Sequence, residues 1–428
     1  MNHTRKNTTW NLNITDGLLR FSNWAIKSTI YLFLTTIAKD HLGENAFLDH
    51  TQAASIYHKL ISLSFIAPVI IIFLSDWMWG KFKLIRILLY LQSIFTLGLL
   101  FTNDRFDFTL LIISIAMIIY SSIKAPLTAF IGDQAGGRQK NRFLVEFLFI
   151  EIGVMTAEWV CPWVLINYSY NTLCKLLICS SLSASICFSW CTQNYNIQPV
   201  NTNNHKSIEE ILKTLKNSLY QWRLEGFLCA MYFFLYVQVS TLWQSTAHIF
   251  NPSLLLAIKP YHINPILTGC NFLGILLLLK TKLNTLSTER KIKTAFILAI
   301  TSYLLFGSLI FIHSMTSLVT IPMLIPLLFL KGVSFALFLP ELIKKAYQTG
   351  EKNWKSIATY RFYFSLGIGH SLASLIYQNI YGQSLYDTIG RINTVFLVAL
   401  ISMITLIIYA TNTKKVAAKK NMTRLLIG

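Results

Sequence analysis

Cysteine is rare in this sequence, and the familiar motifs of enzyme chemistry are missing. The seven cysteines lie in or beside apolar segments and form no Cys-x-x-Cys pair, so neither a disulfide framework nor a zinc site is indicated. They fit better as small apolar packing residues. No glycine-rich nucleotide loop, metal-ligand cluster or nucleophile–base constellation stands out. We therefore expect no cofactor, no metal and no enzymatic activity.

Acidic residues are also scarce, with 18 Asp and Glu against 37 Lys and Arg, for a net charge of +19. Such an excess can indicate nucleic-acid binding, but the charge would then sit on a soluble domain. Here Lys and Arg crowd every second connector between long apolar segments. The charge therefore indicates membrane topology, and we expect no nucleic-acid partner.

Hydrophobic residues supply 54% of the chain and gather in segments long enough to cross a bilayer, which takes about 20 residues of helix. The segments lack the alternation of barrel strands, so the sequence predicts an all-α integral membrane protein with twelve transmembrane helices. The predicted spans are 15–38, 52–75, 84–102, 108–131, 143–167, 172–191, 224–249, 263–279, 292–313, 319–343, 356–379 and 391–410.

The basic residues set the orientation. The N-terminus, every second connector and the C-terminal tail hold 26 of the 37 Lys and Arg, whereas the six opposite connectors hold five. By the positive-inside rule both termini are cytoplasmic. We expect a multi-pass protein of the plasma membrane, or bacterial inner membrane, with the lipid bilayer as its environment.

The chain divides at its longest polar stretch, 192–223. Ser207 and Glu210 have capping-box spacing there, and the apolar residues that follow predict a short amphipathic helix on the cytoplasmic surface. Six spans lie on each side, in 1–191 and 224–428. Two six-helix halves are the architecture of the major-facilitator fold.

The connector between the second and third spans carries a candidate gating loop. Residues 76–83 (DWMWGKFK) place Asp76 before a turn at Gly80 and a basic pair that begins with Lys81. The run resembles the Asp-Arg-x-x-Gly-Lys/Arg turn of the major facilitator superfamily, although two of the usual basic residues are aromatic here. The alternative is an ordinary short loop anchored by interfacial tryptophans.

Charged residues inside the spans carry the most functional information, because each costs roughly 2.5–3.5 kcal/mol at the bilayer centre even on the lenient insertion scale. They can be static ion pairs, or they can face water and ligand. We expect a functional role for Arg20, Lys27, Lys124 and Glu151, and static pairing for Glu146, near the cytoplasmic end. Two cations of the first span lie on one helical face, as do two carboxylates of the fifth, so that they could complement one another across a cavity. The charges in question are Arg20 and Lys27, Lys124, and Glu146, Glu151 and Glu158.

Further polar residues lie in later spans. His370 and His248 could titrate near neutrality, but a lone transmembrane histidine more often bonds a neighbouring helix. Arg361 and Lys331 could add to a positive cavity or snorkel to the interface, and we favour snorkelling for Lys331.

Several segments resemble proton-dependent oligopeptide transporters. Residues 16–27 (DGLLRFSNWAIK) look like that family's opening signature, ExxERFxYYG. Residues 124–134 (KAPLTAFIGDQ) are similar to its KPNxxxxxGDQ segment, and 150–153 (IEIG) to its INxG. Asn264-Pro265 matches an Asn-Pro of the eighth helix. The similarity extends over nearly the whole chain, and the 124–134 segment is its most specific part.

The resemblance implies a transporter of short peptides with a central cavity. Arg20, Lys27, Lys124 and Asn264 would take over the family's substrate and coupling positions. Arg20 and Lys124 would face the peptide carboxylate, and Asn264 would hydrogen-bond the peptide. Glu151 replaces an asparagine and would suit a cationic amino terminus.

The departures from the family concern proton coupling. Its coupling carboxylates on the first, seventh and tenth helices become Leu19, Val237 and Phe335, and another glutamate is shortened to Asp16. We therefore expect proton coupling to be possible but weakened. A replacement anion is expected near the retained cations, and Glu158, with Asp16, is assigned as a coupling or ion-pair residue.

These observations predict a secondary active transporter of di- and tripeptides that works by alternating access. One alternative is a transporter or exchanger of another small anionic metabolite. A second is a membrane receptor or scaffold that does not transport. No obligate protein partner is evident.

Overall fold

The computed structural model describes residues 2–40, 43–102, 105–134, 142–190, 195, 197, 208–240, 242–247, 249–251, 262–351, 354–379 and 395–412. Within these ranges, helical segments overlap each of the predicted spans. The N-terminal helices are α1 (Asn2–Thr36), α2 (His50–Ile66), α3 (Val69–Trp77), α4 (Lys81–Gly98), α5 (Phe106–Gln134), α6 (Arg142–Asn167) and α7 (Tyr170–Trp190). A 3₁₀ turn at Leu99–Phe101 extends α4.

A linker helix, α8 (Ile208–Gln221), lies in the stretch for which the sequence predicts a short amphipathic helix. The C-terminal helices are α9 (Arg223–Val237), α10 (Leu242–Ala247), α11 (Ile263–Lys280), α12 (Thr288–Thr316), α13 (Ile325–Thr349), α14 (Lys355–Asn379) and Val395–Asn412. The 3₁₀ segments Gln238–Ser240, Lys282–Thr285 and Ile321–Leu324 join or extend them.

Eight helical segments of the described chain are long and apolar enough to cross a membrane. The other four predicted spans correspond to α1, α6, the interrupted α9–α10 and α14, which carry buried charges or a break. The twelve-span count therefore stays a prediction, whereas the all-helical membrane architecture is confirmed.

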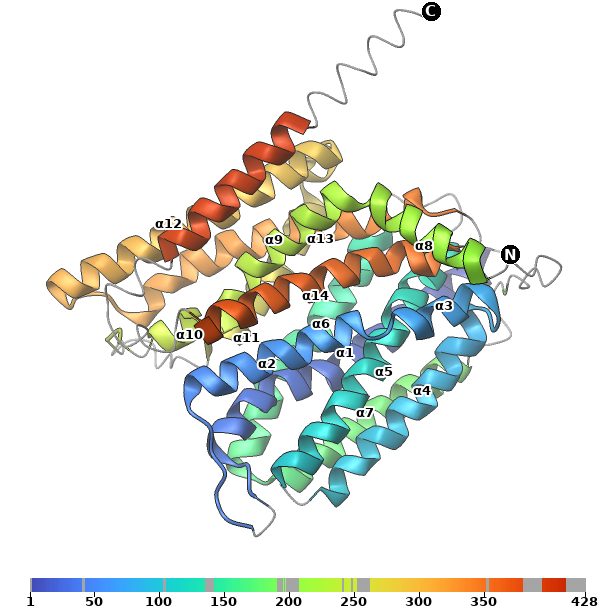
Figure 1. Cartoon of the computed structure of the whole chain (residues 1–428), viewed down its shortest axis with the longest axis horizontal. Coiled ribbons are helices and arrows are strands. Elements are labelled where there is room, and N and C mark those ends of the chain that lie inside the picture. Colours follow the sequence, from blue (N-terminus) through green and yellow to red (C-terminus); the bar gives the residue numbers. More distant parts are fainter. Residues whose placement is uncertain are drawn as a thin grey trace, which may run out of the picture.

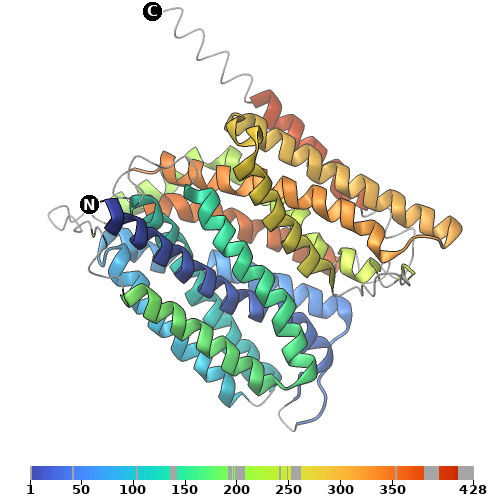
Figure 2. The same cartoon turned by 180° about the vertical axis from the view of Figure 1, so that it is seen from behind.

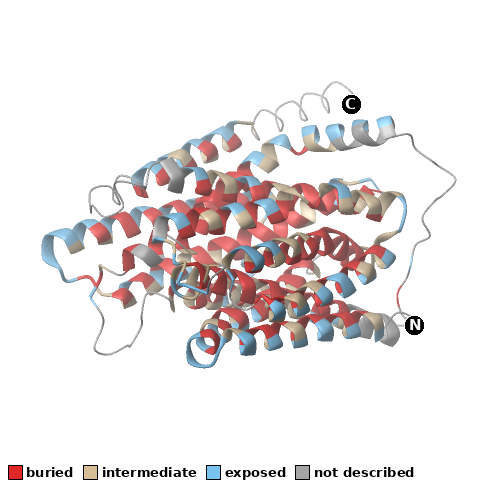
Figure 3. Cartoon of the chain, turned by 60° about the horizontal axis from the view of Figure 1, so that its bottom comes forward, coloured by how far each residue is buried: buried red, intermediate tan, exposed pale blue. Residues whose placement is uncertain are grey.

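The helices pack as two bundles. Figure 1 shows α1–α7, in blue to green, on one side of the molecule and α9–α14 with Val395–Asn412, in yellow-green to red, on the other. The same division is visible from behind in Figure 2. The bundles meet where α14 packs on α2 and α5, and where α6 packs on α11 and α13. Buried residues, red in Figure 3, concentrate in the middle of the molecule.

Two predicted spans are interrupted. The second breaks between α2 and α3 at Pro68, whose missing N–H cannot continue the helical ladder. The seventh, predicted as one span, ends its first part at Val237 and continues as a 3₁₀ turn and α10. Non-helical backbone at membrane depth needs neighbouring side chains to satisfy the freed polar groups. At the Pro68 break, the Tyr360 hydroxyl of α14 donates to the carbonyls of Phe65 (3.0 Å) and Ile66 (2.7 Å).

Candidate functional site

A buried ion-pair cluster joins the first, fourth and fifth spans. The Lys124 ammonium of α5 donates to Asp16 of α1 and lies 3.5 Å from a carboxylate oxygen of Glu146 on α6. The Thr128 hydroxyl donates to the same oxygen of Glu146, at 2.8 Å. All three charged side chains are buried. Lys124 is therefore ion-paired with two carboxylates, one on α1 and one on α6.

Arg20 lies one turn after Asp16 on the same helix and is 7% exposed. Its guanidinium lies over the ring of Tyr120, 5.5 Å from the centroid. Among the described residues it has no ion pair, and its Nε has no hydrogen-bond partner. One oxygen each of Asp16 and Glu146 and the Tyr120 hydroxyl are likewise buried without a partner. These four groups can still hydrogen-bond to a ligand or to water.

Lys27 lies two turns further along α1 and is 3% exposed. Its ammonium contacts two aromatic faces, with centroids at 4.6 Å for Trp24 and 4.7 Å for Phe65. Within the described chain it has neither an ion pair nor a hydrogen bond. Lys27 is thus a buried cation without an anion.

Two further carboxylates of α6, Glu151 and Glu158, face α11 in the other bundle. Glu158 accepts hydrogen bonds from the Trp24 indole (2.6 Å) and the Thr268 hydroxyl (2.8 Å). Glu151 accepts from the Asn271 amide at 3.2 Å. Among the described residues Glu158 has no ion pair, and its two oxygens each accept from a neutral donor. These contacts instead hold α1, α6 and α11 together across the junction.

Asn264, the predicted peptide-binding asparagine, lies in the first turn of α11. Its backbone carbonyl lies 3.3 Å from the Thr268 hydroxyl, the same hydroxyl that donates to Glu158. The amide that meets Glu151 is Asn271, which also donates to the Tyr236 hydroxyl at 2.6 Å. Sequence reasoning missed Asn271, although its seven-residue spacing from Asn264 puts both on one face of the helix.

Two further contacts cross the junction at buried positions. The hydroxyls of Thr128 on α5 and Tyr363 on α14 lie 3.2 Å apart. The Nδ1 atoms of His58 on α2 and His370 on α14 lie 3.2 Å apart. The preferred interpretation of His370, a hydrogen bond to a neighbouring helix, is confirmed. His248 lies outside the described residues.

The predicted gating loop also reaches the other bundle. One Asp76 oxygen accepts from the backbone N–H groups of Ser356 (2.8 Å) and Ile357 (3.1 Å), at the N-terminus of α14. A carboxylate is favourable there because of the free N–H groups and the helix dipole. Gly80 has φ of 74°, a backbone conformation that favours glycine.

Lys81 completes this loop by pairing with Asp133, at the end of α5 (2.6 Å). The other oxygen of Asp133 accepts from the Tyr347 hydroxyl of α13 at 2.8 Å. The loop is therefore part of a polar network that joins both bundles at the predicted cytoplasmic end.

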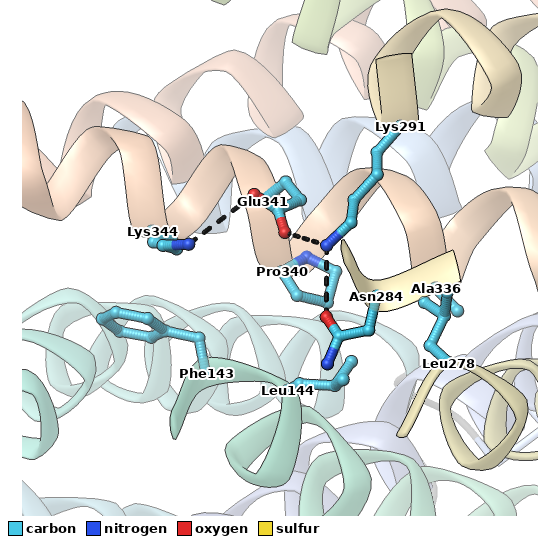
Figure 4. Close-up of a pocket in the computed structure, with 9 residues that line it drawn as sticks. All are labelled: Phe143, Leu144, Leu278, Asn284, Lys291, Ala336, Pro340, Glu341 and Lys344. Carbon is cyan, nitrogen blue, oxygen red and sulfur yellow. Dashed lines mark hydrogen bonds and ion pairs between the residues drawn. The ribbon is translucent and has the colours of Figure 1, made fainter. Parts of the chain in front are cut away.

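A second polar cluster at this end lies within the C-terminal bundle, beside a pocket (Figure 4). Glu341 of α13 pairs with Lys291 of α12 (2.5 Å), and Lys344 lies 3.9 Å away. Lys291 also donates to Asn284 at 3.2 Å. These contacts fasten the start of α12 to α13 and leave Glu341 fully paired.

The prediction that Lys331 snorkels to the membrane interface is wrong. This residue is 1% exposed and donates to the carbonyls of Leu235 (3.1 Å) and Tyr236 (3.4 Å), beside the break after α9. Arg361 is also buried, and three of its contacts are carbonyls, one of them Ser218 of α8 at 2.9 Å. Both cations donate to backbone oxygens in the interior of the protein. The positions of these oxygens depend on the tertiary fold and cannot be read from composition.

The arrangement has no metal-binding group of His, Cys, Asp and Glu among the described residues. It provides one unpaired cation, an arginine with spare donors, and two carboxylates held by neutral donors, all at the junction of two bundles.

No protein-family model and no curated protein sequence matches the chain. Solved structures do match over nearly its full length. An auto-inhibited POT family peptide transporter superposes with a TM-score of 0.75 at 13% identity, covering 95% of this chain and 97% of its own. The POT family transporter PepTSo gives 0.73 at 14% identity, with 96% and 98% covered.

A further proton-dependent oligopeptide (POT) family transporter gives 0.72 at 15% identity, with 93% of this chain and 99% of its own covered. At these identities the likeness establishes the fold. The chain therefore has the major-facilitator fold of the POT family transporters, as the similarity of its sequence segments predicted.

Proposed function

We propose that this protein is a secondary active transporter of short peptides that works by alternating access between its two bundles. The observation that carries the proposal is the unpaired, buried Lys27 cation. Its ammonium contacts the ring of Trp24, whose indole donates to Glu158 at the contact between α6 and α11. Structures that share the fold include a POT family transporter in complex with a thioalcohol-conjugated peptide.

Lys27 is the group best suited to a peptide carboxylate. Burying an ammonium without an anion is costly, and a bound carboxylate would offset that cost. Its aromatic neighbours Trp24 and Phe65 contribute a weaker attraction. Arg20, with its unpartnered Nε, supplies a second donor on the same helix. Lys124, which already contacts two carboxylates, acts as a structural partner of this site.

Glu151 is the group best suited to the peptide amino terminus. One of its oxygens accepts from Asn271, and it has no ion pair among the described residues. A cationic amine would supply the missing charge. With Lys27 and Glu151 on facing helices of the junction, the site would take zwitterions.

We further propose that proton drive is weak. Leu19, Val237 and Phe335 are buried apolar residues at the positions where the resembled family has carboxylates. They cannot hold a proton, so counterflow of substrate should exceed accumulation under an inward proton gradient.

The test is transport into liposomes that contain the purified protein. Labelled dipeptide should exchange against internal dipeptide, and unlabelled di- and tripeptides should compete. Competition by simple organic anions alone would favour the second candidate, an exchanger of small anionic metabolites, which the unpaired Lys27 also supports. Absence of flux for both classes would favour a receptor or scaffold.

The orientation has its own test. We propose that the 192–223 linker faces the cytoplasm, on the basis of its basic residues and those of the connectors on the same side. A cysteine at Asn203 should escape an impermeant thiol reagent added to intact cells, in a background whose native cysteines are replaced. Labelling at that position would reverse the orientation.

A further inference from the structure

The break in the seventh span contains a buried cation that the proposed site does not use. The Lys331 ammonium, from α13, lies beside the carbonyls of Leu235 and Tyr236 in the last turn of α9. Aromatic rings surround it, with centroids at 4.3 Å for Tyr303, 4.9 Å for Trp243 and 5.6 Å for Tyr236. The described part of the chain offers it no carboxylate.

This environment has the chemistry of a cation site. The last carbonyls of a helix lack intrahelical partners and carry the negative end of its dipole. In transporters with broken helices, such carbonyls coordinate coupling cations. Aromatic faces add attraction for an ammonium in a desolvated setting. Lys331 thus places a covalently attached cation where a free ion could otherwise bind.

The Pro68 break shows that a positive charge is not required merely to satisfy freed carbonyls. There the neutral hydroxyl of Tyr360 donates to two carbonyls of α2. At the α9 break the Tyr303 hydroxyl already donates to Leu235, at 2.6 Å. The ammonium of Lys331 is therefore additional to a neutral donor of the same kind.

Tyr236 connects the break to the proposed substrate site. Its carbonyl accepts from Lys331, and its hydroxyl accepts from the Asn271 amide at 2.6 Å. The same amide donates to Glu151 at 3.2 Å. A shift of the last turn of α9 would consequently move the hydroxyl that orients Asn271, and with it the donor to Glu151.

We propose that Lys331 is a tethered cation that holds the seventh span in its broken form and thereby positions Asn271 and Glu151 for substrate. Lys331 is a positioning residue, because it acts through Tyr236 and touches no substrate. The proposal rests on the proposed transport function, but its cation site can be tested without transport.

The first experiment replaces the tethered cation by a free one. Lys331→Ala removes three methylenes and the ammonium, a fragment that propylammonium reproduces. Propylammonium should raise the thermal unfolding midpoint of purified Lys331→Ala in a saturable manner, because a ligand that binds only the folded state stabilises it. Wild type should show no such rise, and neither should Lys59→Ala, which alters an exposed lysine of α2. Sodium at equal ionic strength is the salt control.

An equal response of Lys331→Ala and Lys59→Ala to propylammonium would overturn the cation site. This measurement stands even if the protein transports no peptide, so its failure is distinguishable from failure of the proposed function.

The second experiment tests positioning. Lys331→Met keeps most of the volume and removes the charge. We expect its maximal counterflow rate to fall about tenfold, a change of about 1.4 kcal/mol in the barrier, while the folded protein keeps its unfolding midpoint. Propylammonium should partly restore the rate of Lys331→Ala. Full wild-type rate in Lys331→Met would show that Lys331 is only a tolerated buried charge, and would refute the positioning role.

Discussion

Lys124 and Lys27 are both buried lysines of the N-terminal bundle, yet their surroundings are opposite. Lys124 contacts the carboxylates of Asp16 and Glu146, whereas Lys27 contacts the rings of Trp24 and Phe65. An unpaired buried charge is costly. Two carboxylates compensate the charge of Lys124, whereas no carboxylate among the described residues compensates that of Lys27. The comparison separates a cation that stabilises the fold from one that is available to a ligand.

The comparison also bears on the role expected of Lys124 from sequence. The resemblance placed Lys124 at a substrate position, from which Lys124→Ala should abolish uptake while leaving membrane insertion intact. Two carboxylates, which lie 108 and 22 residues away in the chain, occupy that ammonium. Loss of Lys124 is therefore expected to act first on stability.

The largest effect is predicted for Lys124→Met. It leaves two carboxylates buried without their cation, which should lower the free energy of unfolding by about 3–5 kcal/mol. Denaturant or thermal unfolding of the purified protein in detergent measures this loss. Adding Asp16→Asn should recover part of it, since the double variant removes one of the stranded charges. An unchanged midpoint in Lys124→Met would remove the distinction between the two lysines.

A smaller effect on stability and a larger one on transport are predicted for Lys27→Met. Removing an unpaired buried cation should leave the unfolding midpoint unchanged or higher. Dipeptide counterflow in liposomes should fall at least about tenfold, equivalent to about 1.4 kcal/mol. Lys59→Met, on the exposed face of α2, is the matched control and should transport normally. Destabilisation as large as that of Lys124→Met would mean that Lys27 has a structural anion.

Glu158→Gln tests whether Glu158 pairs with Lys27 in another state of the transport cycle. In the present structure its oxygens accept from Trp24 and Thr268, so the amide keeps one acceptor and counterflow should fall only a few-fold, about 1 kcal/mol. A loss equal to that of Lys27→Met would show a Lys27–Glu158 pair during transport.

The smallest effect on transport is predicted for Thr268→Val. It removes one hydrogen bond that the Thr268 hydroxyl donates to Glu158 across the junction, worth about 0.5–1.5 kcal/mol. The expected result is a modest drop in the unfolding midpoint with counterflow retained. Complete loss of counterflow would instead place Thr268 among the substrate ligands.

The sequence predicted the parts of this molecule that depend on local composition. Apolar length and basic connectors located the helices, and the cost of intramembrane charge singled out Arg20, Lys27, Lys124 and Glu151. The break after Val237 was missed because both of its flanks are apolar and no proline marks it. Partner identity was also missed wherever it depends on packing between distant segments.

Lys331 and Asn271 illustrate that limit. Lys331 looked like a candidate for snorkelling because nothing local shows that carbonyls from α9 meet it in the interior. Asn271 shares a helical face with Asn264, but only the docking of α11 on α6 places its amide beside Glu151. Hydrogen-bond partners more than 90 residues apart are fixed by the tertiary fold.

The central claim is that Lys27 is an unpaired cation because a peptide carboxylate completes its site. Its most direct test is counterflow of a labelled dipeptide in liposomes, compared with competition by the same dipeptide with an amidated C-terminus. The account predicts robust exchange by wild type, strong competition by the free acid and little by the amide, and loss of exchange in Lys27→Met with its unfolding midpoint retained. Equal competition by acid and amide, or undiminished exchange in Lys27→Met, would contradict it.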